Sequence, residues 1–349
     1  MMKQCILLIC MISILSCKNT PTETTKHASI NTSETSQAKP DFAMVIHGGA
    51  GTILKENMSD EKEKVYLDAL NLALSTGEAI LKNGGSSMDA VVETIKTMEN
   101  SPLFNAGKGA VFTHDGHNEL DASLMRGSDL EAGAIGGVRT IKHPIEAARG
   151  VLEKSEHVFM VGEGADKFGA SLGLETVDNV YFKTERRWNS LQKILEKEKA
   201  MGAQFTQEPD SKYGTVGAVA LDKKGNIVAG TSTGGMTNKR YNRIGDSPVI
   251  GAGTYANDKT CGVSCTGHGE YFIRYAVAHD VSAMMEYKEV SVDEAADNII
   301  NTKLKDAGGS GGLIALDKDG NISMPFNTAG MYRGYVTDSK RFTAIYKEE

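Results

Sequence analysis

The stretch Tyr213-Gly214-Thr215-Val216-Gly217-Ala218-Val219-Ala220 joins a long polar region to a run of small and β-branched residues. By itself the run predicts a loop that enters a buried strand, because valine and threonine favour strands. Alternatively, Thr215 is a nucleophile released by a cut. Gly214 puts the least bulky residue before a hydroxyl amino acid, where a strained backbone is tolerated. The polar region ahead of Thr215 could be released without disturbing a core, and more hydroxyl and glycine residues follow at 230–235.

Downstream of this stretch the sequence predicts mainly strands. The segments 220–227 and 315–322 each contain an apolar run, an Asp-Lys-x-Gly-Asn turn and a second apolar run, which is typical of a β-hairpin. Between them, apolar residues at helical spacing predict helices over 269–287 and 291–305. Ser291 and Glu294 form a capping box at the start of the second helix.

Upstream, strands and helices are grouped. The apolar run 43–46 predicts a strand that ends in a glycine turn at 47–51. Spacing and start signals predict helices over 61–82 and 86–99, from Pro144, and over 184–201, with strands such as 110–112 within 105–137. Grouped elements of this kind indicate packed sheets covered by helices, not a repeated strand–helix–strand unit.

Composition excludes several classes of protein. The chain has 349 residues, 40% of them hydrophobic, which is enough for one large core or two moderate ones. The net charge is −7 and no dense Lys/Arg block occurs, so we expect no nucleic-acid partner. Cys261 and Cys265 lack zinc or redox spacing and are expected to be small core residues on a strand. No phosphate-loop or dinucleotide fingerprint occurs, so we expect no cofactor for the chemistry.

The N-terminal segment is not expected to belong to the fold. Lys3 precedes the apolar run 5–15, which is too short to span a bilayer comfortably. The run ends in Ile14-Leu15-Ser16-Cys17, which resembles the lipobox of bacterial lipoproteins; the alternative is a plain secretory peptide with an incidental cysteine. The resemblance implies a signal peptide over 1–17, lipids on Cys17, and an exported, membrane-anchored protein in the periplasm or at the cell surface. Residues 18–41 have the composition of a disordered tether.

Seven motifs follow one another along the rest of the chain. They are 47–51 (HGGAG), 102–107 (PLFNAG), 214–222 (GTVGAVALD), 231–239 (TSTGGMTNK), 243–248 (RIGDSP), 265–267 (CTG) and 308–313 (GGSGGL). In this order they resemble the isoaspartyl peptidase/plant-type L-asparaginase family, over about residues 42–349. One motif would be weak evidence, whereas seven in the family's order are hard to ascribe to coincidence.

The resemblance implies an α+β fold, the four-layer αββα sandwich of the N-terminal nucleophile hydrolases, made as one precursor. The precursor breaks into an α subunit over 42–214 and a β subunit over 215–349 that starts with the nucleophile Thr215. A threonine hydroxyl is a weak nucleophile and needs an adjacent base. After the cut, the base can be the α-amino group of Thr215, whose reference pKa is about 8. No Ser/His/Asp triad is then needed.

The resemblance also assigns roles around Thr215. Thr233 resembles the second threonine, which hydrogen-bonds the nucleophile, and Asn105 resembles a helper beside it. The hydroxyl of Thr266 and the amide of Gly267 resemble the oxyanion hole. Two donors held in place there suit a developing negative charge.

Substrate recognition is implied in the same way. Arg243 resembles the residue that grips the substrate α-carboxylate, and Asp246 the residue that receives its α-ammonium. Taken alone, these two residues predict only a surface ion pair. With the motif, they imply L-asparagine and β-aspartyl dipeptides as small-molecule substrates. His268, directly after the oxyanion glycine, carries no role in the family pattern.

In the family, a loop that matches 98–108 wraps a structural sodium ion, and hard oxygen ligands suit such an ion. The carbonyls expected to bind it are those of Met98, Glu99, Ser101, Phe104, Ala106 and Lys108. The alternative is a plain turn. The family also implies a dimer of αβ heterodimers, which would contact a membrane only through the lipid anchor.

Two other functions remain open from the sequence. A glycosylasparaginase of the same superfamily would need a site open enough for a sugar, and its threonine usually follows an acidic residue, where this chain has Gly214. A catalytically silent, lipid-anchored binding protein is the second. Retention of Thr215, Thr233, Arg243 and Thr266 together argues against it.

Overall fold

The computed structural model describes residues 39–200 and 214–347, so Cys17, the segment 1–38 and the loop 201–213 lie outside the described residues. Two sheets form its centre, with strand orders β12-β11-β1-β5-β6-β2-β3-β4 and β10-β9-β8-β7. The strands are β1 (Ala43–Gly51), β2 (Leu120–Arg126), β3 (Ala132–Val138), β4 (Phe159–Val161), β5 (Val216–Leu221), β6 (Ile227–Thr233), β7 (Thr254–Ala256), β8 (Cys261–Gly267), β9 (Gly311–Asp317), β10 (Ile322–Ser323), β11 (Gly330–Thr337) and β12 (Arg341–Tyr346). The helices are α1 (Asp60–Lys82), α2 (Ser87–Glu99), α3 (Pro144–Lys154), α4 (Gly162–Ser171), α5 (Glu185–Ala200), α6 (Gly269–Arg274), α7 (Val277–Lys288) and α8 (Val292–Asp297).

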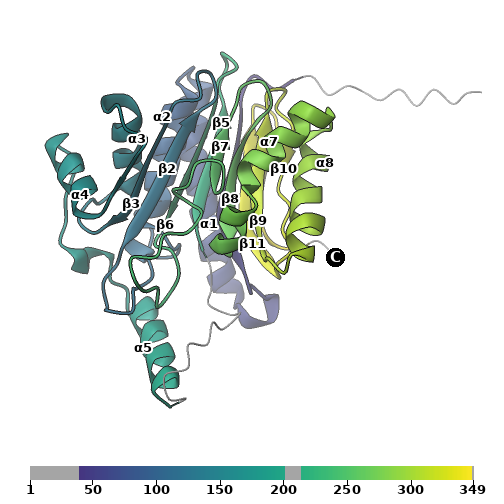
Figure 1. The fold of residues 1–349 in the computed structure, drawn as a ribbon. Helices are drawn as coiled ribbons and strands as arrows, with labels where there is room; N and C mark the ends of the chain where they lie inside the picture. Colours follow the sequence, from purple (N-terminus) through teal and green to yellow (C-terminus); the bar gives the residue numbers. More distant parts are fainter. Residues whose placement is uncertain (1–38, 201–213, 348–349) are drawn as a thin grey trace, which may run out of the picture. The chain divides into compact units, whose positions relative to one another are not determined.

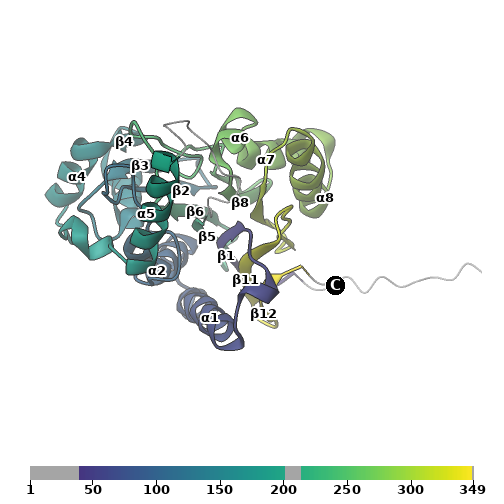
Figure 2. The same ribbon diagram turned by 90° about the horizontal axis from the view of Figure 1, so that it is seen from below.

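Helices cover the outer face of each sheet. Leu74 of α1 and Ile95 of α2 pack with Met44 of β1 in one apolar cluster, and Val281 of α7 packs with Val263 of β8 in another. A third cluster lies between the sheets, where β1 and β5 face β9. The layers therefore run helix, sheet, sheet, helix, as Figures 1 and 2 show from two sides. The predicted αββα sandwich is confirmed.

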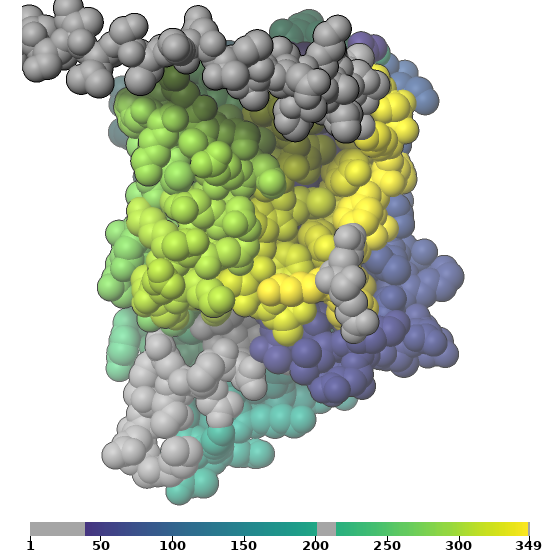
Figure 3. Space-filling model, turned by 90° about the vertical axis from the view of Figure 1, so that its right-hand side faces the viewer, coloured from purple at the N-terminus to yellow at the C-terminus, as the bar shows by residue number. Residues whose placement is uncertain are grey.

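Helices α7 and α8 cover the outer face of the smaller sheet. Figure 3 shows this region in green beside the yellow C-terminal strands. Within residues 39–200 and 214–347, no helix is long and apolar enough to cross a membrane.

Both predicted hairpins are confirmed, as β5–β6 and β9–β10. In each turn an aspartate, Asp222 or Asp317, accepts the backbone N–H two residues ahead at 2.9 Å. Cys261 and Cys265 are buried on β8 with free thiols, as expected. The helices predicted from the upstream sequence correspond to α1, α2, α3 and α5.

The glycine turn predicted at 47–51 is wrong, because β1 continues to Gly51 between β11 and β5, with all nine residues buried. The register with β11 shifts between His47 and Gly49. Gly49 takes φ +111°, which a glycine adopts easily. These glycines let a central strand bulge and approach its neighbours closely.

Three other predicted elements differ. The helix expected over 269–287 is α6 and α7, separated by Ala276 at φ +48°. The helix expected over 291–305 starts as predicted, with Ser291 Oγ accepting the Glu294 N–H at 3.1 Å, but continues from α8 into a π-helical segment at Asn298–Leu304. No strand forms at 110–112, where Phe112 makes only an isolated bridge.

Candidate active site

Thr215 lies buried at the start of β5, in the middle of the larger sheet. Its hydroxyl donates to Thr233 Oγ1 at 3.1 Å, and the Thr233 hydroxyl donates to the carbonyl oxygen of Gly214 at 3.2 Å. A third bond, from the N–H of Gly235 at 3.0 Å, fixes Thr233 Oγ1. A hydroxyl nucleophile therefore lies beside a peptide bond whose carbonyl already accepts a hydrogen bond.

Gly214 is tightly packed between Gly49 and Asn105. A Cβ on Gly49 would lie 2.7 Å from Gly214 Cα, and a Cβ on Gly214 would lie 3.1 Å from the Cβ of Asn105. Gly214 is not among the residues with positive φ. Space rather than backbone strain therefore calls for a glycine here, which corrects the reason expected from the sequence.

Asn105 is buried and supports the turn that follows Thr233. Its side-chain oxygen accepts the N–H of Val111 at 2.9 Å, and its side-chain amide donates to the carbonyl of Gly235 at 2.7 Å. Its own carbonyl accepts the N–H of Gly234 at 3.0 Å. These bonds place Asn105 beside Gly214 as a support for the turn after Thr233, and none of them goes to Thr215.

His47 lies in a sequence motif that gives it no role, yet it holds the backbone of the nucleophile. Its Nδ1 lies 2.9 Å from the carbonyl oxygen of Thr215 and its Nε2 lies 3.0 Å from Ser264 Oγ. A carbonyl only accepts, so Nδ1 carries the proton and Nε2 accepts from the Ser264 hydroxyl. Burial lowers the pKa of His47 to about 3, against the raising effect of the Thr215 bond. His47 is therefore a neutral support and not a base.

A chain of buried hydroxyls continues from His47. It consists of Ser264, Thr231, Thr254 and Ser123, with neighbouring oxygens 2.5 to 2.7 Å apart. Because Ser264 donates to His47, Thr231 must donate to Ser264, and Thr254 donates to Thr231. The last member, Ser123, lies 2.6 Å from the carbonyl of Ser247, which follows Asp246. The chain connects the backbone of the nucleophile to the loop that carries Asp246.

Arg243 and Asp246 come from the loop between β6 and β7. Arg243 donates to both carboxylate oxygens of Glu270, from Nε at 2.9 Å and from Nη2 at 3.0 Å. His268 Nε2 lies 3.3 Å from the same carboxylate. The surface ion pair between Arg243 and Asp246 does not form. Glu270, which the sequence did not single out, holds the guanidinium and would have to share it with a substrate carboxylate.

Asp246 is buried, and its Oδ2 has no hydrogen-bond partner among the described residues. Burial raises the pKa of this carboxyl to about 7, although the nearby Arg243 charge opposes the shift. A Cβ on Gly269 would lie 2.8 Å from Arg243 Nη2 and 2.9 Å from Asp246 Oδ1, so the two groups flank one small space. A buried carboxylate without a partner is costly, and a ligand ammonium group would satisfy it.

Thr266 and Gly267 end β8, in the smaller sheet. Thr266 Oγ1 accepts the N–H of Ala50 on β1 at 3.2 Å, which leaves its own hydrogen for another acceptor. Gly267 faces Gly311 of β9, and a Cβ on Gly267 would lie 2.5 Å from the carbonyl oxygen of Ser310. The predicted oxyanion donors therefore reach the site from the second sheet.

Gly235 connects the two halves of the site. Its N–H bonds Thr233, and a Cβ on it would lie 3.6 Å from Arg243 Nη1. Thr233 lies on one side of this glycine and Arg243 on the other. The sequence predicted the first for the nucleophile region and the second for the substrate-binding loop.

The sequence pattern of the family described as Asparaginase matches residues 40–345. The chain belongs to this asparaginase family. It is 49% identical to the isoaspartyl peptidase of Escherichia coli (strain K12) over 311 residues, which cover 88% of this chain and 96% of that protein. It is 40% identical to the probable isoaspartyl peptidase/L-asparaginase 2 of Arabidopsis thaliana over 317 residues (85% and 96%) and 41% identical to the plant-type L-asparaginase of Pyrococcus abyssi over 302 residues (85% and 96%). The resemblance seen in the sequence is confirmed.

In this member of the asparaginase family, the loop 98–108 curls back on itself. A Cβ on Gly107 would lie 2.3 Å from the carbonyl oxygen of Glu99, and one on Gly109 would lie 2.0 Å from that of Phe104. The carbonyl oxygens of Glu99 and Phe104 therefore pack directly against these two glycines, in space that a side chain would otherwise occupy. The carbonyls of Met98 and Ala106 each already accept a backbone N–H, at 3.1 and 3.2 Å, and each keeps a second lone pair.

The side chain of Glu99 ties this loop to the strand that carries Thr233. The Ser232 hydroxyl donates to Glu99 Oε1 at 2.6 Å, and His143 Nδ1 lies 3.2 Å from Oε2. Burial raises the pKa of Glu99, against the lowering effect of His143. The asparaginase-family site thus has a buried polar link behind Thr233 that the sequence motifs did not indicate.

Proposed function

We propose that this protein is a threonine hydrolase that cuts itself between Gly214 and Thr215 and then hydrolyses β-aspartyl dipeptides and L-asparagine, releasing L-aspartate. The observation that carries the proposal is the pair of hydrogen bonds that join the hydroxyls of Thr215 and Thr233 to the Gly214 carbonyl. The relatives named isoaspartyl peptidase or L-asparaginase, aligned over nearly their whole length, support the same activity.

Self-cleavage begins when Thr215 Oγ1 attacks the carbonyl carbon of Gly214. The bond from Thr233 to the carbonyl oxygen stabilises the negative charge that develops there. The C–N bond breaks, the hydroxyl proton passes to the amide nitrogen, and an ester remains on Thr215. Water hydrolyses this ester and leaves a carboxylate on Gly214 and a free amine on Thr215.

In the mature enzyme, the neutral α-amine of Thr215 takes the proton from its own hydroxyl. Attack on the side-chain carbonyl of the substrate forms an acyl-enzyme, while the Thr266 hydroxyl and the Gly267 amide stabilise the oxyanion. The leaving amine takes the proton and departs, as ammonia or as an amino acid. Water then releases L-aspartate, and the neutral His47 holds the Thr215 backbone in place throughout.

Arg243 and Asp246 determine the choice of substrate. Only a molecule with a free α-carboxylate and a free α-ammonium on one carbon satisfies both groups, so the scissile amide lies on the side chain. A glycosylated asparagine also carries these groups but needs room for a sugar, and Gly214 departs from the acidic residue usual in that family. We therefore favour β-aspartyl dipeptides and L-asparagine. The contacts between Thr215, Thr233 and Gly214 count against a silent binding protein.

One set of measurements tests both the proposed self-cleavage and the proposed recognition of the substrate by Arg243 and Asp246. N-terminal sequencing should find a chain that starts at Thr215, and Thr215→Ala should remain one full-length chain on a denaturing gel. The matured enzyme should hydrolyse β-Asp-Leu and leave α-Asp-Leu intact. If Thr215→Ala is still cut at this bond, another protease is responsible. Equal rates of hydrolysis of the two isomers would contradict the proposed recognition of the substrate by Arg243 and Asp246.

We propose that the loop 98–108 holds a sodium ion through the carbonyls of Met98, Glu99, Ser101, Phe104, Ala106 and Lys108. The tight turn of this loop, in which the carbonyls of Glu99 and Phe104 pack against Gly107 and Gly109, supports the proposal. The ion would fix the loop that carries Asn105 and would take no part in bond breaking. A structure in sodium buffer with these carbonyls turned away from a common centre would exclude the site.

We also propose export with lipid anchoring at Cys17, and assembly as a dimer of αβ heterodimers. The lipobox-like segment and the polar composition of 18–41 support the first proposal, and membership of the family supports the second. The boundaries 1–17, 18–41, 42–214 and 215–349 stay predictions. Analytical ultracentrifugation of the matured protein would test the dimer.

A further inference from the structure

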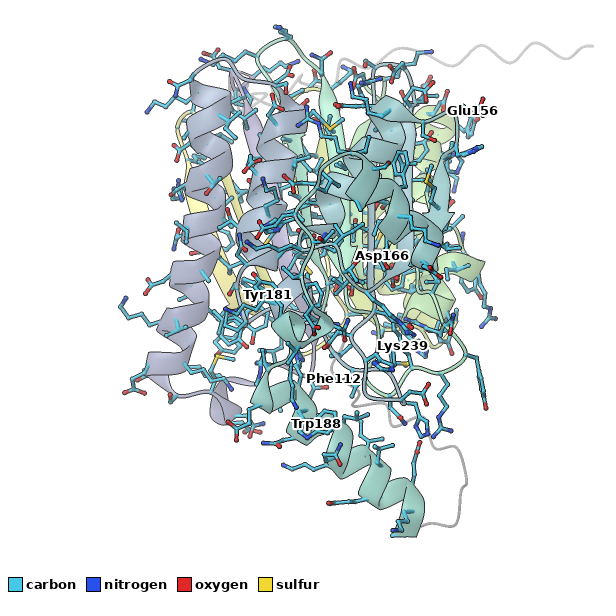
Figure 4. All side chains as sticks on the ribbon, turned by 90° about the vertical axis from the view of Figure 1, so that its left-hand side faces the viewer. Phe112, Glu156, Asp166, Tyr181, Trp188 and Lys239 are labelled. Carbon is cyan, nitrogen blue, oxygen red and sulfur yellow. The ribbon has the colours of Figure 1, made fainter. Side chains whose placement is uncertain are left out.

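A small pocket has Gly214 in its wall. It has a volume of roughly 110 Å³, and its walls include Gly48, Asn105 and Gly214 together with Arg186 and Arg187. The two arginines belong to the first turn of α5, the last described helix before the cut. Trp188, the next residue, packs against Phe112 with ring centroids 5.2 Å apart, and Figure 4 labels both residues at the N-terminal end of α5. The first turn of α5 is therefore fixed against the body of the protein.

Both guanidinium groups bond only to neutral acceptors. Arg186 bonds the hydroxyl of Tyr66 at 2.8 Å and the carbonyls of Pro102 and Leu103 at 3.2 and 2.8 Å. Arg187 donates from Nε to the carbonyl of Gly109 at 2.9 Å. Within residues 39–200 and 214–347, neither guanidinium forms a hydrogen bond or ion pair with a carboxylate, and no side-chain bond is made by the two terminal nitrogens of Arg187.

Arg186 is exposed to solvent, whereas Arg187 is half-buried beside it and loses hydration without gaining an anion from the described residues. Burial lowers the pKa of Arg187 to about 10, and the charge of Arg186 acts in the same direction. A carboxylate in the pocket would remove this penalty, and planar carboxylates match the forked donors of arginine. The polar groups around the pocket therefore suit an anion of carboxylate size.

The self-cut produces such an anion at the wall of the pocket. Hydrolysis of the Gly214–Thr215 bond consumes one water and yields a Gly214 carboxylate and a Thr215 ammonium group. If the carboxylate stayed beside the ammonium, the pair would keep the amine protonated and unable to act as a base. A second binding place for the carboxylate would free both the amine and the space in front of it.

We propose that the pocket binds the new C-terminal carboxylate of Gly214 through Arg186 and Arg187 once the chain has been cut. This inference rests on the proposed self-cleavage and adds a fate for its other product. The α-subunit end is then retracted from the nucleophile and held, so that a substrate can enter.

The experiment measures access of a broad-specificity carboxypeptidase to the new end. Matured αβ enzyme is incubated with the carboxypeptidase, and the mass of the α subunit is followed against time. The denatured α subunit serves as the reference for the same terminal sequence. In the native wild type, loss of Gly214 should be at least roughly tenfold slower than in this reference, as expected for a carboxylate held by charge-assisted bonds.

Three variants complete the design. Arg187→Gln should speed the loss of Gly214 toward the reference rate, whereas Arg187→Lys, which keeps the charge, should retain part of the protection. Arg149→Gln removes a guanidinium that pairs with Asp89 and Glu153 on another face and should behave as wild type.

Trimming of the wild type at the reference rate, or equal protection in Arg187→Gln and wild type, would overturn the proposal. The wild-type and Arg187→Lys comparisons decide it even if Arg187→Gln fails to fold. Failure of the proposed function appears separately, as a wild-type chain that is uncut on a gel before the carboxypeptidase is added.

Discussion

At the scale of single residues, the hydroxyl of Thr233 is placed to serve both of the proposed reactions. In the uncut chain it accepts from Thr215 and donates to the carbonyl that Thr215 attacks. In the mature enzyme that we propose, the same hydroxyl would stay beside the nucleophile. One side chain therefore couples maturation to turnover.

Removal of this hydroxyl should slow both reactions. In Thr233→Ala, self-cleavage should fall by about 10²- to 10³-fold, because one preorganised donor to the developing oxyanion is lost. Thr233→Ser should restore most of the rate, and Thr97→Ala, on the partly buried surface of α2, should leave it unchanged. Densitometry of full-length and cut chains over time gives the rates. A normal rate in Thr233→Ala would contradict the role given to this residue.

The buried carboxyl of Asp246 should set part of the pH dependence. Burial raises its pKa to about 7, so the group is mainly neutral below pH 7 and mainly charged above it. Because a substrate ammonium needs the charged form, kcat/KM for β-Asp-Leu should fall by about tenfold per pH unit well below 7. The Thr215 amine, with a reference pKa of about 8, also contributes to this limb.

A variant separates the two contributions. The negative charge of Glu270 raises the pKa of Asp246, so Glu270→Gln should move the acid limb of kcat/KM to lower pH. An acid limb that stays at the same pH in this variant would show that Asp246 does not control it.

The residues that sequence reasoning identified and those it missed differ in a physical way. Thr215, Thr233 and Arg243 carry reactive groups inside motifs, so their chemistry is visible in the sequence. His47 acts by holding a carbonyl 168 positions away, and Glu270 by binding a guanidinium 27 positions away. Such roles depend on the packing of two sheets, which no local pattern contains.

At the scale of elements, β5 can carry the nucleophile because its second residue has no side chain. A Cβ on Gly217 would lie 2.0 Å from Ser264 Oγ and 2.3 Å from His47 Nε2. Side chains of β1 and β8 can therefore approach β5 this closely only because residue 217 is a glycine.

Gly217→Ala should block maturation, since the methyl group would displace His47 from the Thr215 carbonyl. The expected product is a folded, full-length chain on a denaturing gel. Gly164→Ala is the matched control, because a Cβ there meets nothing within 4 Å and the residue lies in α4. Circular dichroism checks the fold of both variants. Efficient cutting of a folded Gly217→Ala protein would show that His47 is not needed for the cut.

The elements that were predicted well carry local signals, and the rest do not. Ser86 and Ser291 each cap a helix through a hydrogen bond to the N–H three residues ahead. The break at Ala276, which takes the left-handed conformation at φ +48°, has no glycine or proline to mark it in the sequence. The sequence predicts too short a strand for β1, because glycines usually end strands. In the structure these glycines instead allow close packing of neighbours on both sides of the strand.

At the scale of the whole molecule, the family pattern begins at residue 40, and Cys17 lies ahead of it. Cys17→Ser should move the protein from the membrane fraction to the soluble fraction, because several acyl chains are lost at once. The kcat/KM on β-Asp-Leu should not change, since the 22 residues 18–39 separate Cys17 from the family pattern that starts at residue 40. Immunoblots of fractionated cells and steady-state kinetics measure the two effects. Unchanged partition into membranes would contradict lipidation at this residue.

The order of the larger sheet has one more consequence. From one edge, β12 and β11 come from the chain after the cut, β1 from before it, β5 and β6 from after it, and β2, β3 and β4 from before it. The larger sheet is therefore built from both products in alternation, whereas the smaller sheet comes only from the chain after the proposed cut. If the proposed cut occurs, only the uncut precursor folds as one continuous chain. A cut molecule that is unfolded would lack the covalent link between its halves, so its refolding would require two separate chains to meet.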